Sequence, residues 1–368
     1  MIQVSKPFIG AKEIRYVNAA LEEGWISSTG RFIDEFEEKF ARWLGVRHAV
    51  TCSSGTTALH LALLALGVGP GDEVIVPSLS FVATINAVIY TGATPILADV
   101  DPTTWGLSPD KVKRALTRRT KAVIVVHLYG LPADSRGLQD LIGPLGIHLV
   151  EDAAEGLGGW DGDAPVGTLG HIAIFSFYGN KVMSTGEGGM LVTGDADLAN
   201  LARRYRGQGQ DPHKRYFHDL VGYNYRLTNL QCALGVAQLE RLDDELKKRA
   251  DIFTWYTNLI RQAGLPVEIP IPRLGCIQAP WLFTILLDET NARRRDNLQS
   301  ELAKLAIETR PSFFIAQDMP PYVNYPRRPA NHPHAASLSK RGLSLPTHTS
   351  LVREDVERVV AGLASTLK

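Results

Sequence analysis

The sequence has few cysteines, no long apolar run and no excess of charge of either sign. Its three cysteines, Cys52, Cys232 and Cys276, are far apart and form no C-x-x-C pair, which argues against a disulfide framework and against a zinc ribbon. No run reaches the roughly 18 apolar residues of a membrane-spanning helix. The first residues, MIQVSKP, lack the apolar core of a signal peptide. We therefore expect a cytoplasmic protein with no membrane partner.

The charge balance gives no reason to expect nucleic acid as a partner, because lysine plus arginine equals aspartate plus glutamate at 39 each. A small molecule is the expected partner. With 368 residues, 45% of them hydrophobic, the chain can bury a large core and is long enough for two domains.

Short β-rich runs alternate with helical patterns in the first two thirds of the chain, which is typical of a parallel sheet covered by helices. The predicted strands are 48–52, 73–76, 95–98, 121–126, 147–151, 172–177 and 190–193. Amphipathic stretches between them include 58–66, 83–91, 109–116 and 196–206.

A long helical pattern runs from about Leu227 toward Ile260 and is expected to carry the chain out of the large domain. We predict a large domain over residues 1–245 and a smaller C-terminal α/β domain over 246–368, with the N-terminal segment as a candidate to pack on the smaller one. The proline-rich stretch 266–280 fits either a linker or an edge segment.

Lys181 has surroundings that suit a reactive amine. It follows the apolar and aromatic run 172–177 and precedes a glycine-rich turn. A lysine held partly out of water at a strand end has a lowered pKa and suits Schiff-base formation. A phosphate-binding loop is excluded, because Asn180 and Val182 replace the glycine and the hydroxyl residue of that motif. A plain surface lysine remains the alternative from this segment alone.

Gly55 and Thr56 lie where a predicted strand meets a predicted helix, in the segment SSGTTA. Free backbone N–H groups and small hydroxyls at a helix N-terminus predict an anion site. A simple capped helix start is the alternative.

Asp152 comes just after an apolar run, at the C-terminal end of a predicted buried strand, where open α/β sheets bind ligands. A carboxylate there needs a cationic partner, which in a pyridoxal enzyme is the protonated ring nitrogen. Capping of a following helix is the alternative, and it is stronger for Glu151 than for Asp152. Ala154 is small enough to leave room for a flat ring.

Two further residues are ambiguous by themselves. Phe81 follows a predicted strand end and suits stacking on a ring, although an aromatic residue there is more often part of the core. Asn224 places a polar side chain between aromatic residues. No metal is expected, because the histidine pairs lack the spacing or convergent carboxylates of a zinc site. These pairs are His332 with His334 and His213 with His218.

Together these segments resemble the DegT group of sugar aminotransferases, among the fold-type-I pyridoxal phosphate enzymes, and within it most closely the GDP-perosamine synthases. The resemblance covers nearly the whole chain. It rests on ordered motifs: WISS at 25–28, GTTALH at 55–60, GPGDEVIVPS at 69–78, VHLYG at 126–130, EDAAE at 151–155, FSF at 175–177, GNK at 179–181, TGEGGM at 185–190, RGQG at 206–209 and GYNYR at 222–226.

The resemblance implies an α/β fold-type-I aminotransferase, with a large mostly parallel sheet domain covered by helices and a smaller C-terminal α/β domain. It implies that Lys181 forms a Schiff base with pyridoxal 5'-phosphate and that pyridoxamine 5'-phosphate is the intermediate form. The cofactor contacts that it implies are Gly55, Thr56 and Ser176 at the phosphate, Phe81 and Ala154 at the ring faces, Asp152 at the ring nitrogen, Glu155 near the ring hydroxyl, and Asn224 at the phosphate of a neighbouring subunit. Because Asn224 would reach the cofactor of the neighbouring subunit, the resemblance also implies a homodimer with shared active sites.

The substrates implied are L-glutamate as amino donor and a nucleotide-linked 4-keto-6-deoxy sugar as acceptor. The favoured acceptor is GDP-4-keto-6-deoxy-D-mannose. The substrate-binding candidates are Trp25, Ser27, Ser28, Gln317 and His348, the last in a small-domain motif that also fits a structural role.

The segment 310–322 departs from the perosamine pattern. The family commonly has histidine at the position of Gln317, and the perosamine enzymes have another at Phe314. A dTDP- or UDP-linked sugar, amination at C3, and a dehydratase therefore stay open. A related dehydratase group replaces the lysine by histidine, so the intact Lys181 favours transamination. A non-catalytic, cofactor-sensing protein is the remaining alternative.

Overall fold

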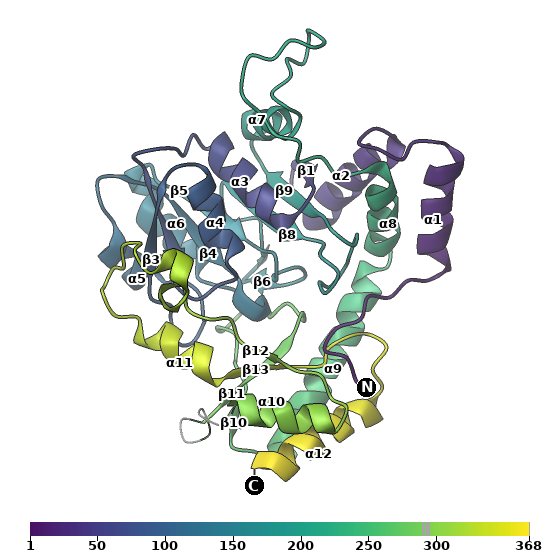
Figure 1. Cartoon of the computed structure of the whole chain (residues 1–368), viewed down its shortest axis with the longest axis vertical. Coiled ribbons are helices and arrows are strands. Elements are labelled where there is room, and N and C mark those ends of the chain that lie inside the picture. Colours follow the sequence, from purple (N-terminus) through teal and green to yellow (C-terminus); the bar gives the residue numbers. More distant parts are fainter. Residues whose placement is uncertain (289–290, 292–294, 368) are drawn as a thin grey trace.

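A seven-stranded sheet forms the centre of the larger part of the molecule (Figure 1). The structure is a computed structural model and describes residues 1–288, 291 and 295–367. The strand order is β1 (His48–Cys52), β9 (Gly189–Thr193), β8 (Ile172–Ser176), β5 (His148–Asp152), β4 (Thr120–Val126), β2 (Glu73–Pro77) and β3 (Thr94–Ala98). The sheet is parallel except for β9, which runs antiparallel to both neighbours. The predicted parallel-sheet fold class and all seven predicted strands are confirmed.

Helices cover both faces of this sheet because its buried strands carry apolar residues on both sides. In β2, Val74 and Val76 pack on one side and Ile75 packs on the other. The first side is covered by α3 (Gly55–Ala65), α4 (Ala83–Tyr90) and α7 (Ala196–Arg206), and the second by α5 (Pro109–Ala115) and α6 (Ser135–Ile142).

A second apolar cluster lies beside β8 and β9. Phe36 and Phe40 of α2 (Arg31–Leu44) contact Phe175 and Phe177, with ring centres 5.2 to 5.6 Å apart. The cluster joins α1 (Ala11–Glu22), α2 and α8 (Asn229–Leu239) to the sheet.

The long helical pattern after Leu227 is divided into two helices, α8 and α9 (Leu242–Gln262). The helix breaks at Glu240 and Arg241, which bind Lys39 and Glu13 of the N-terminal helices. Three acidic residues then fill the first turn of α9, where the helix dipole favours negative charge. The sequence pattern alone did not reveal this break, because the apolar spacing continues across it.

A four-stranded antiparallel sheet follows α9, in the order β10 (Val267–Glu268), β11 (Phe283–Leu287), β13 (Gly342–Leu345) and β12 (Arg310–Pro311). The edge strand β10 lies within the proline-rich stretch 266–280. Helices α9, α10 (Arg295–Lys304) and α12 (Arg353–Leu367) pack with this sheet around one apolar core. Ile2 also lies in that core and pairs with Ile307, so the N-terminus lies beside the second sheet.

The remaining elements are short, apart from α11 (Pro333–Arg341). They are the β6 (Trp160–Asp161) and β7 (Ala164–Pro165) pair and the 3-10 turns Leu128–Gly130, Gly143–Leu145, Ala316–Asp318 and Pro320–Tyr322. None of the helices in the described residues is both long and apolar enough to cross a membrane.

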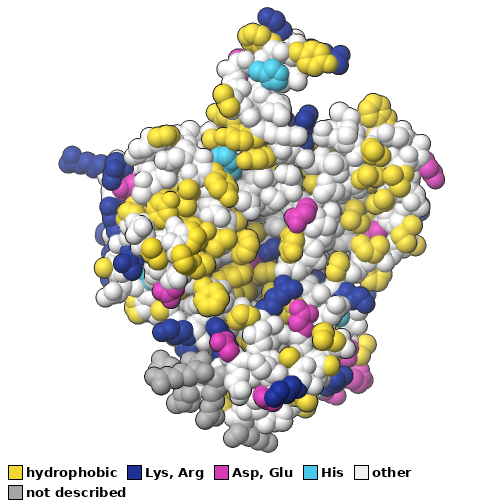
Figure 2. Space-filling model, viewed as in Figure 1, with side chains coloured by type: hydrophobic (Ala, Val, Ile, Leu, Met, Phe, Trp, Pro, Cys, Tyr) yellow, Lys and Arg dark blue, Asp and Glu magenta, His cyan; other side chains and the backbone are white. Residues whose placement is uncertain are grey.

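The segment between α7 and α8 projects away from the body of the molecule (Figure 1). Its tip displays apolar and basic side chains (Figure 2). Tyr216 is 76% exposed and Val221 is 85% exposed.

Candidate functional site

A cavity of about 530 Å³ lies at the C-terminal ends of β4, β5 and β8. Its opposite wall comes from the second sheet and the segments beside it. The lining residues used below are Gly55, Thr56, Ser80, Phe81, Tyr129, Asp152, Ala154, Glu155, Ser176, Asn180, Lys181, Trp281, Arg310 and Phe313. All the cofactor contacts predicted within one subunit therefore lie around one cavity.

One end of the cavity is formed by the start of α3. Ser54 caps this helix and accepts a hydrogen bond from the N–H of Thr57 at 3.2 Å. Gly55 and Thr56 belong to the first turn, whose N–H groups have no acceptor within a helix. A Cβ on Gly55 would lie 3.1 Å from the Cβ of Ser176, so glycine allows the helix start to approach β8 closely. The arrangement fits a phosphate group better than a cap alone requires.

Gly189 brings β9 against the same helix start. A Cβ there would lie 2.5 Å from the carbonyl carbon of Ser54, a distance that backbone atoms cannot accommodate. The glycine-rich turn after Lys181 therefore has a steric role at this end of the cavity.

Asp152 lies on the cavity floor at the end of β5. One carboxylate oxygen accepts a 2.7 Å hydrogen bond from the Thr84 hydroxyl, and the other accepts from the N–H of Ala154 at 3.2 Å. Burial raises the pKa of Asp152, because the charged form has few solvent contacts. A cationic ligand group bound there would stabilise the carboxylate.

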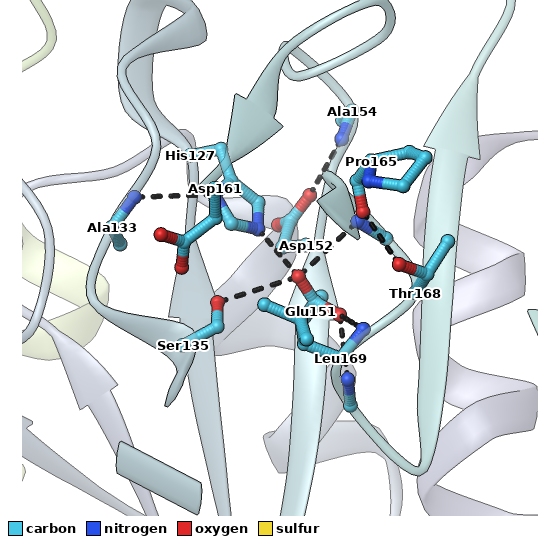
Figure 3. Close-up of polar contacts among 12 residues, drawn as sticks. His127, Ala133, Ser135, Glu151, Asp152, Ala154, Asp161, Pro165, Thr168 and Leu169 are labelled. Carbon is cyan, nitrogen blue, oxygen red and sulfur yellow. Dashed lines mark hydrogen bonds and ion pairs between the residues drawn. The ribbon is translucent and has the colours of Figure 1, made fainter. Parts of the chain in front are cut away.

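Glu151, the preceding residue, has a different role (Figure 3). Its carboxylate is fully buried and does not line the cavity. It accepts hydrogen bonds from Leu169 N–H at 2.7 Å, Gly170 N–H at 2.6 Å and Gly167 N–H at 3.2 Å. The helix-capping alternative does not hold for either acid, since the next α-helix after β5 in the described residues is α7. Glu151 instead fixes the loop that leads to β8.

His127 completes the support of Glu151. Its Nδ1 accepts from the N–H of Ala133 at 3.2 Å, so the ring proton is on Nε2, which donates to Glu151 at 3.0 Å. These contacts anchor β5 immediately before Asp152 (Figure 3).

Lys181 points into the cavity with its side chain 13% exposed. Its Nζ lies 3.7 Å from Oε1 of Glu155 and 3.8 Å from the ring centre of Trp281. Burial lowers the pKa of Lys181, and nearby Arg310 acts in the same direction. Burial also raises the pKa of Glu155 to about 7. The amine is therefore more easily deprotonated than a surface lysine.

The predicted ring-stacking residues lie around the same space. Phe81 is 55% exposed, and its ring centre is 5.7 Å from that of Phe313. Ala154 follows Asp152 and lines the cavity. A flat ring bound over Asp152 would have these two side chains nearby.

The other predicted site residues do not line this cavity. Asn224 is exposed, and its Oδ1 accepts from Arg226 at 3.2 Å. The carbonyls of Trp25 and Ser27 accept hydrogen bonds from Asn229. Ser28 is partly buried beside them, Gln317 lies in a 3-10 turn, and His348 is buried just beyond β13. Their binding roles stay predictions.

Several cavity residues had no predicted role. Tyr129 lies within the VHLYG motif, which is part of the family resemblance. The motif did not predict which residues Tyr129 contacts. Arg310 and Phe313 lie in the segment 310–322, which the sequence singled out only for its departure from the perosamine pattern. Trp281 had no signal, because it reaches the cavity only through the tertiary fold, and neither had Thr84, which contacts Asp152 without lining the cavity.

Comparison with known proteins places the whole chain in one family. Residues 7–364 match the model of the DegT/DnrJ/EryC1/StrS aminotransferase family. A GDP-perosamine synthase of Caulobacter vibrioides is 44% identical over 366 residues, which cover 100% of this chain and 98% of that protein. A GDP-perosamine synthase of Vibrio cholerae is 42% identical, covering 98% of this chain and 97% of that protein.

The fold agrees with solved structures of aminotransferases. The crystal structure of the aminotransferase TlmJ from Streptoalloteichus hindustanus superposes with a TM-score of 0.92 at 32% identity and covers all of both chains. The predicted enzyme class and pyridoxal phosphate as cofactor are confirmed. The chain belongs to the DegT/DnrJ/EryC1/StrS aminotransferase family.

Proposed function

We propose that this enzyme transfers the amino group of L-glutamate to the C4 carbonyl of a nucleotide-linked 4-keto-6-deoxy sugar, with GDP-4-keto-6-deoxy-D-mannose as the acceptor. The observation that carries the proposal is the convergence of Lys181, Asp152 and the start of α3 on one cavity. The similarity to two GDP-perosamine synthases over nearly their full lengths supports this acceptor.

The residues present fit pyridoxal phosphate. Asp152 would pair with the ring nitrogen, while Gly55, Thr56 and Ser176 would hold the phosphate. Phe81 and Ala154 would lie at the ring faces, and Glu155 near the ring hydroxyl. When bound, the cofactor supplies an electron sink for the charge that develops on the substrate carbon.

Lys181 is the group that moves the proton. With its pKa lowered by burial, its neutral amine can take a proton from the carbon of the amino donor. The resulting ammonium then lies beside Glu155, at the 3.7 Å separation of the two side chains. Lys181 later returns a proton to C4 of the sugar.

The active unit that we propose is a homodimer, in which Asn224 of each subunit reaches the cofactor phosphate of the other. Asn224 is exposed and adjoins the projecting segment, whose apolar side chains at Tyr216 and Val221 are poorly covered within one chain. Trp25, Ser27 and Ser28 would then contact the acceptor substrate together with Gln317 and His348.

The domain boundary that we propose is at 245/246, within α9, and the two separate sheets support it. We also infer a cytoplasmic location. The three cysteines are unpaired thiols, as a reducing compartment favours.

An acceptor with another nucleotide is the second candidate. Phe313, in the segment that departs from the perosamine pattern, lines the cavity. Phe314, one of the two positions that depart from the pattern, is the next residue, so the departure adjoins this wall and suits a changed acceptor.

The test is to load the protein with pyridoxamine 5'-phosphate and offer GDP-, dTDP- and UDP-linked 4-keto-6-deoxy sugars separately. We expect an amino sugar from the GDP substrate, with the amine at C4 by mass spectrometry and NMR. In a separate reaction, the protein loaded with pyridoxal 5'-phosphate should convert glutamate to 2-oxoglutarate. Product only with another nucleotide would remove the GDP acceptor. If the protein reacts with glutamate but aminates none of the three sugars, the proposal of a nucleotide-linked 4-keto-6-deoxy sugar as acceptor is wrong.

A further inference from the structure

Lys181 makes its closest aromatic contact with a residue that comes from the other part of the chain. Its Nζ lies 3.8 Å from the ring centre of Trp281, which precedes β11 of the second sheet. In the described residues, no other aromatic ring has this contact with Lys181.

Trp281 is held firmly in this place. It is 3% exposed, and its Nε1 donates a 2.9 Å hydrogen bond to the carbonyl of Asn180, the residue before the lysine. Its ring is stacked with that of Tyr129 at 6.0 Å and 11°. The indole therefore contacts both the side chain of Lys181 and the backbone that carries it.

Tyr129 extends this arrangement to the other neighbour of the amine. Its N–H donates to Oε2 of Glu155 at 2.7 Å, and its hydroxyl accepts from the N–H of Phe313 at 3.0 Å. The carboxylate and the indole that face Lys181 are thus both fixed by the same tyrosine.

We propose that Trp281 is a positioning residue that holds the ammonium of Lys181 over its indole face whenever the lysine is not bonded to the cofactor. The proposal rests on the transaminase function proposed above. During a transamination cycle the lysine must be released and must stay close to the reacting carbon. A lysine side chain with free rotamers would spend much of that time elsewhere.

The indole face also influences the protonation of the amine. The face of an aromatic ring is negative and attracts a cation. Around Lys181, the carboxylates of Glu155 and Asp152 favour the ammonium in the same way, whereas burial and the cation of Arg310 disfavour it. The indole of Trp281 would therefore counter the lowering of the Lys181 pKa by burial, without adding a charge. The amine could then hold a proton and still release it.

The decisive experiment measures the amine of Lys181 directly in the full-length, cofactor-free protein. An amine-reactive ester is applied at a series of pH values, and peptide mass spectrometry gives the labelling rate at Lys181. Lys39, which contacts Glu35 and Glu240, is the internal control.

All six tryptophans are replaced biosynthetically by mono- and then multiply fluorinated tryptophan, which weakens the negative ring face and leaves the packing nearly unchanged. We expect the pKa of Lys181 to fall stepwise with fluorination, by roughly 0.5 to 1.5 in the most fluorinated protein. Lys39 should not change. An unaltered pKa of Lys181 across the series would overturn the proposal.

Trp281→Leu and Trp281→Phe provide the second measurement, with circular dichroism as the test of folding. Removal of the ring in the leucine variant should lower the pKa of Lys181 more than the phenylalanine substitution does. Equal values in both variants and in the parent would contradict the proposal. If the leucine variant does not fold, the pKa of Lys181 in the fluorinated proteins still tests the proposal.

Failure of this proposal can be distinguished from failure of the proposed function. The labelling measures a property of one amine and requires no turnover. If the pKa is insensitive to the ring while the parent still aminates a keto sugar, only the role of Trp281 is lost. If the pKa responds but no keto sugar is aminated, only the proposed reaction is lost.

Discussion

The hydroxyl of Thr84 donates a 2.7 Å hydrogen bond to the carboxylate of Asp152, and Ser80 lies 3.0 Å from the same hydroxyl. Both Thr84 and Asp152 are buried. Asp152 thus has a neutral donor from α4 that favours its charged form.

Thr84→Val should therefore weaken cofactor binding while it keeps the shape of the side chain. Loss of the donor leaves one buried carboxylate oxygen unsatisfied, which costs about 1–3 kcal/mol and favours protonated Asp152. We expect the dissociation constant for pyridoxal phosphate to rise about tenfold at neutral pH, as measured by fluorescence titration. Thr84→Ser, which retains the hydroxyl, is the matched control, and equal affinities in the two variants would count against this role.

Lys181→Ala should abolish transamination. The variant lacks the amine that we propose moves the proton, so the rate of amino transfer from glutamate should fall by at least about 10²–10⁴-fold. Asp152 and the start of α3, the proposed cofactor contacts, remain, so a non-covalent complex should still form. Stopped-flow absorbance checks the rate, and Lys39→Ala is the control. Substantial activity in Lys181→Ala would refute the assignment of the reactive amine.

Glu155→Gln should change how stability depends on pH. The pKa of Glu155 is about 7 in the folded protein against 4.5 when unperturbed, so the folded state binds more protons between these values. The parent should therefore lose stability as the pH rises from 4.5 to 7. The loss relative to Glu155→Gln has an upper limit of about 3 kcal/mol.

Urea unfolding of the cofactor-free proteins at several pH values measures this difference. The parent and variant both retain Lys181, so the comparison isolates the carboxyl group as closely as the chain allows. Parallel stability curves across the interval would show that Glu155 titrates normally.

Glu37→Ala should destabilise the protein without affecting the cavity. The buried carboxylate accepts from Arg206 at 2.8 Å, from Arg203 at 3.1 Å, and from Thr51 N–H and hydroxyl at 2.9 Å. Its loss removes the carboxylate partner of both guanidinium groups, which then keep only oxygens of Ala49 and Thr51 in β1. Breaking such a buried pair costs about 3–5 kcal/mol. Chemical unfolding measures the loss.

Asp110→Ala is the control for the Glu37 variant. Asp110 pairs with Arg114 at 3.0 Å, but both side chains are more than 60% exposed. We expect almost no change in stability from this substitution. Equal effects of the two variants would contradict the importance of burial at Glu37.

The central sheet could be predicted from the sequence because each strand is a short β-rich run and helical patterns separate most of these runs. All seven strands begin and end within one residue of the predicted bounds. The C-terminal part of the chain was predicted only as a small α/β unit. Its strand β12 has two residues, Arg310 and Pro311, too few to show an alternating pattern.

The cavity residues that the sequence predicted lie at strand ends and at a helix start. The carboxyl ends of parallel strands meet at one edge of a sheet, so residues at these points are expected to lie close together. Asp152 and Gly55 are of this kind. Trp281 and Arg310 are not, because their proximity to Lys181 depends on how the second sheet folds back against the first. Thr84 lies in an apolar helix, and only the folded structure shows that its hydroxyl reaches Asp152.

The two walls of the cavity come from stretches of chain that are far apart. Residues before 190 form the wall that contains Lys181, whereas Arg310, Pro311 and Phe313 lie on the facing wall, next to the second sheet. Substitutions in the facing wall leave the β5 and β8 strand ends in place. Substitutions at Pro311 or Phe313 can therefore reshape the facing wall of the cavity while Lys181, Glu155 and Asp152 keep their places.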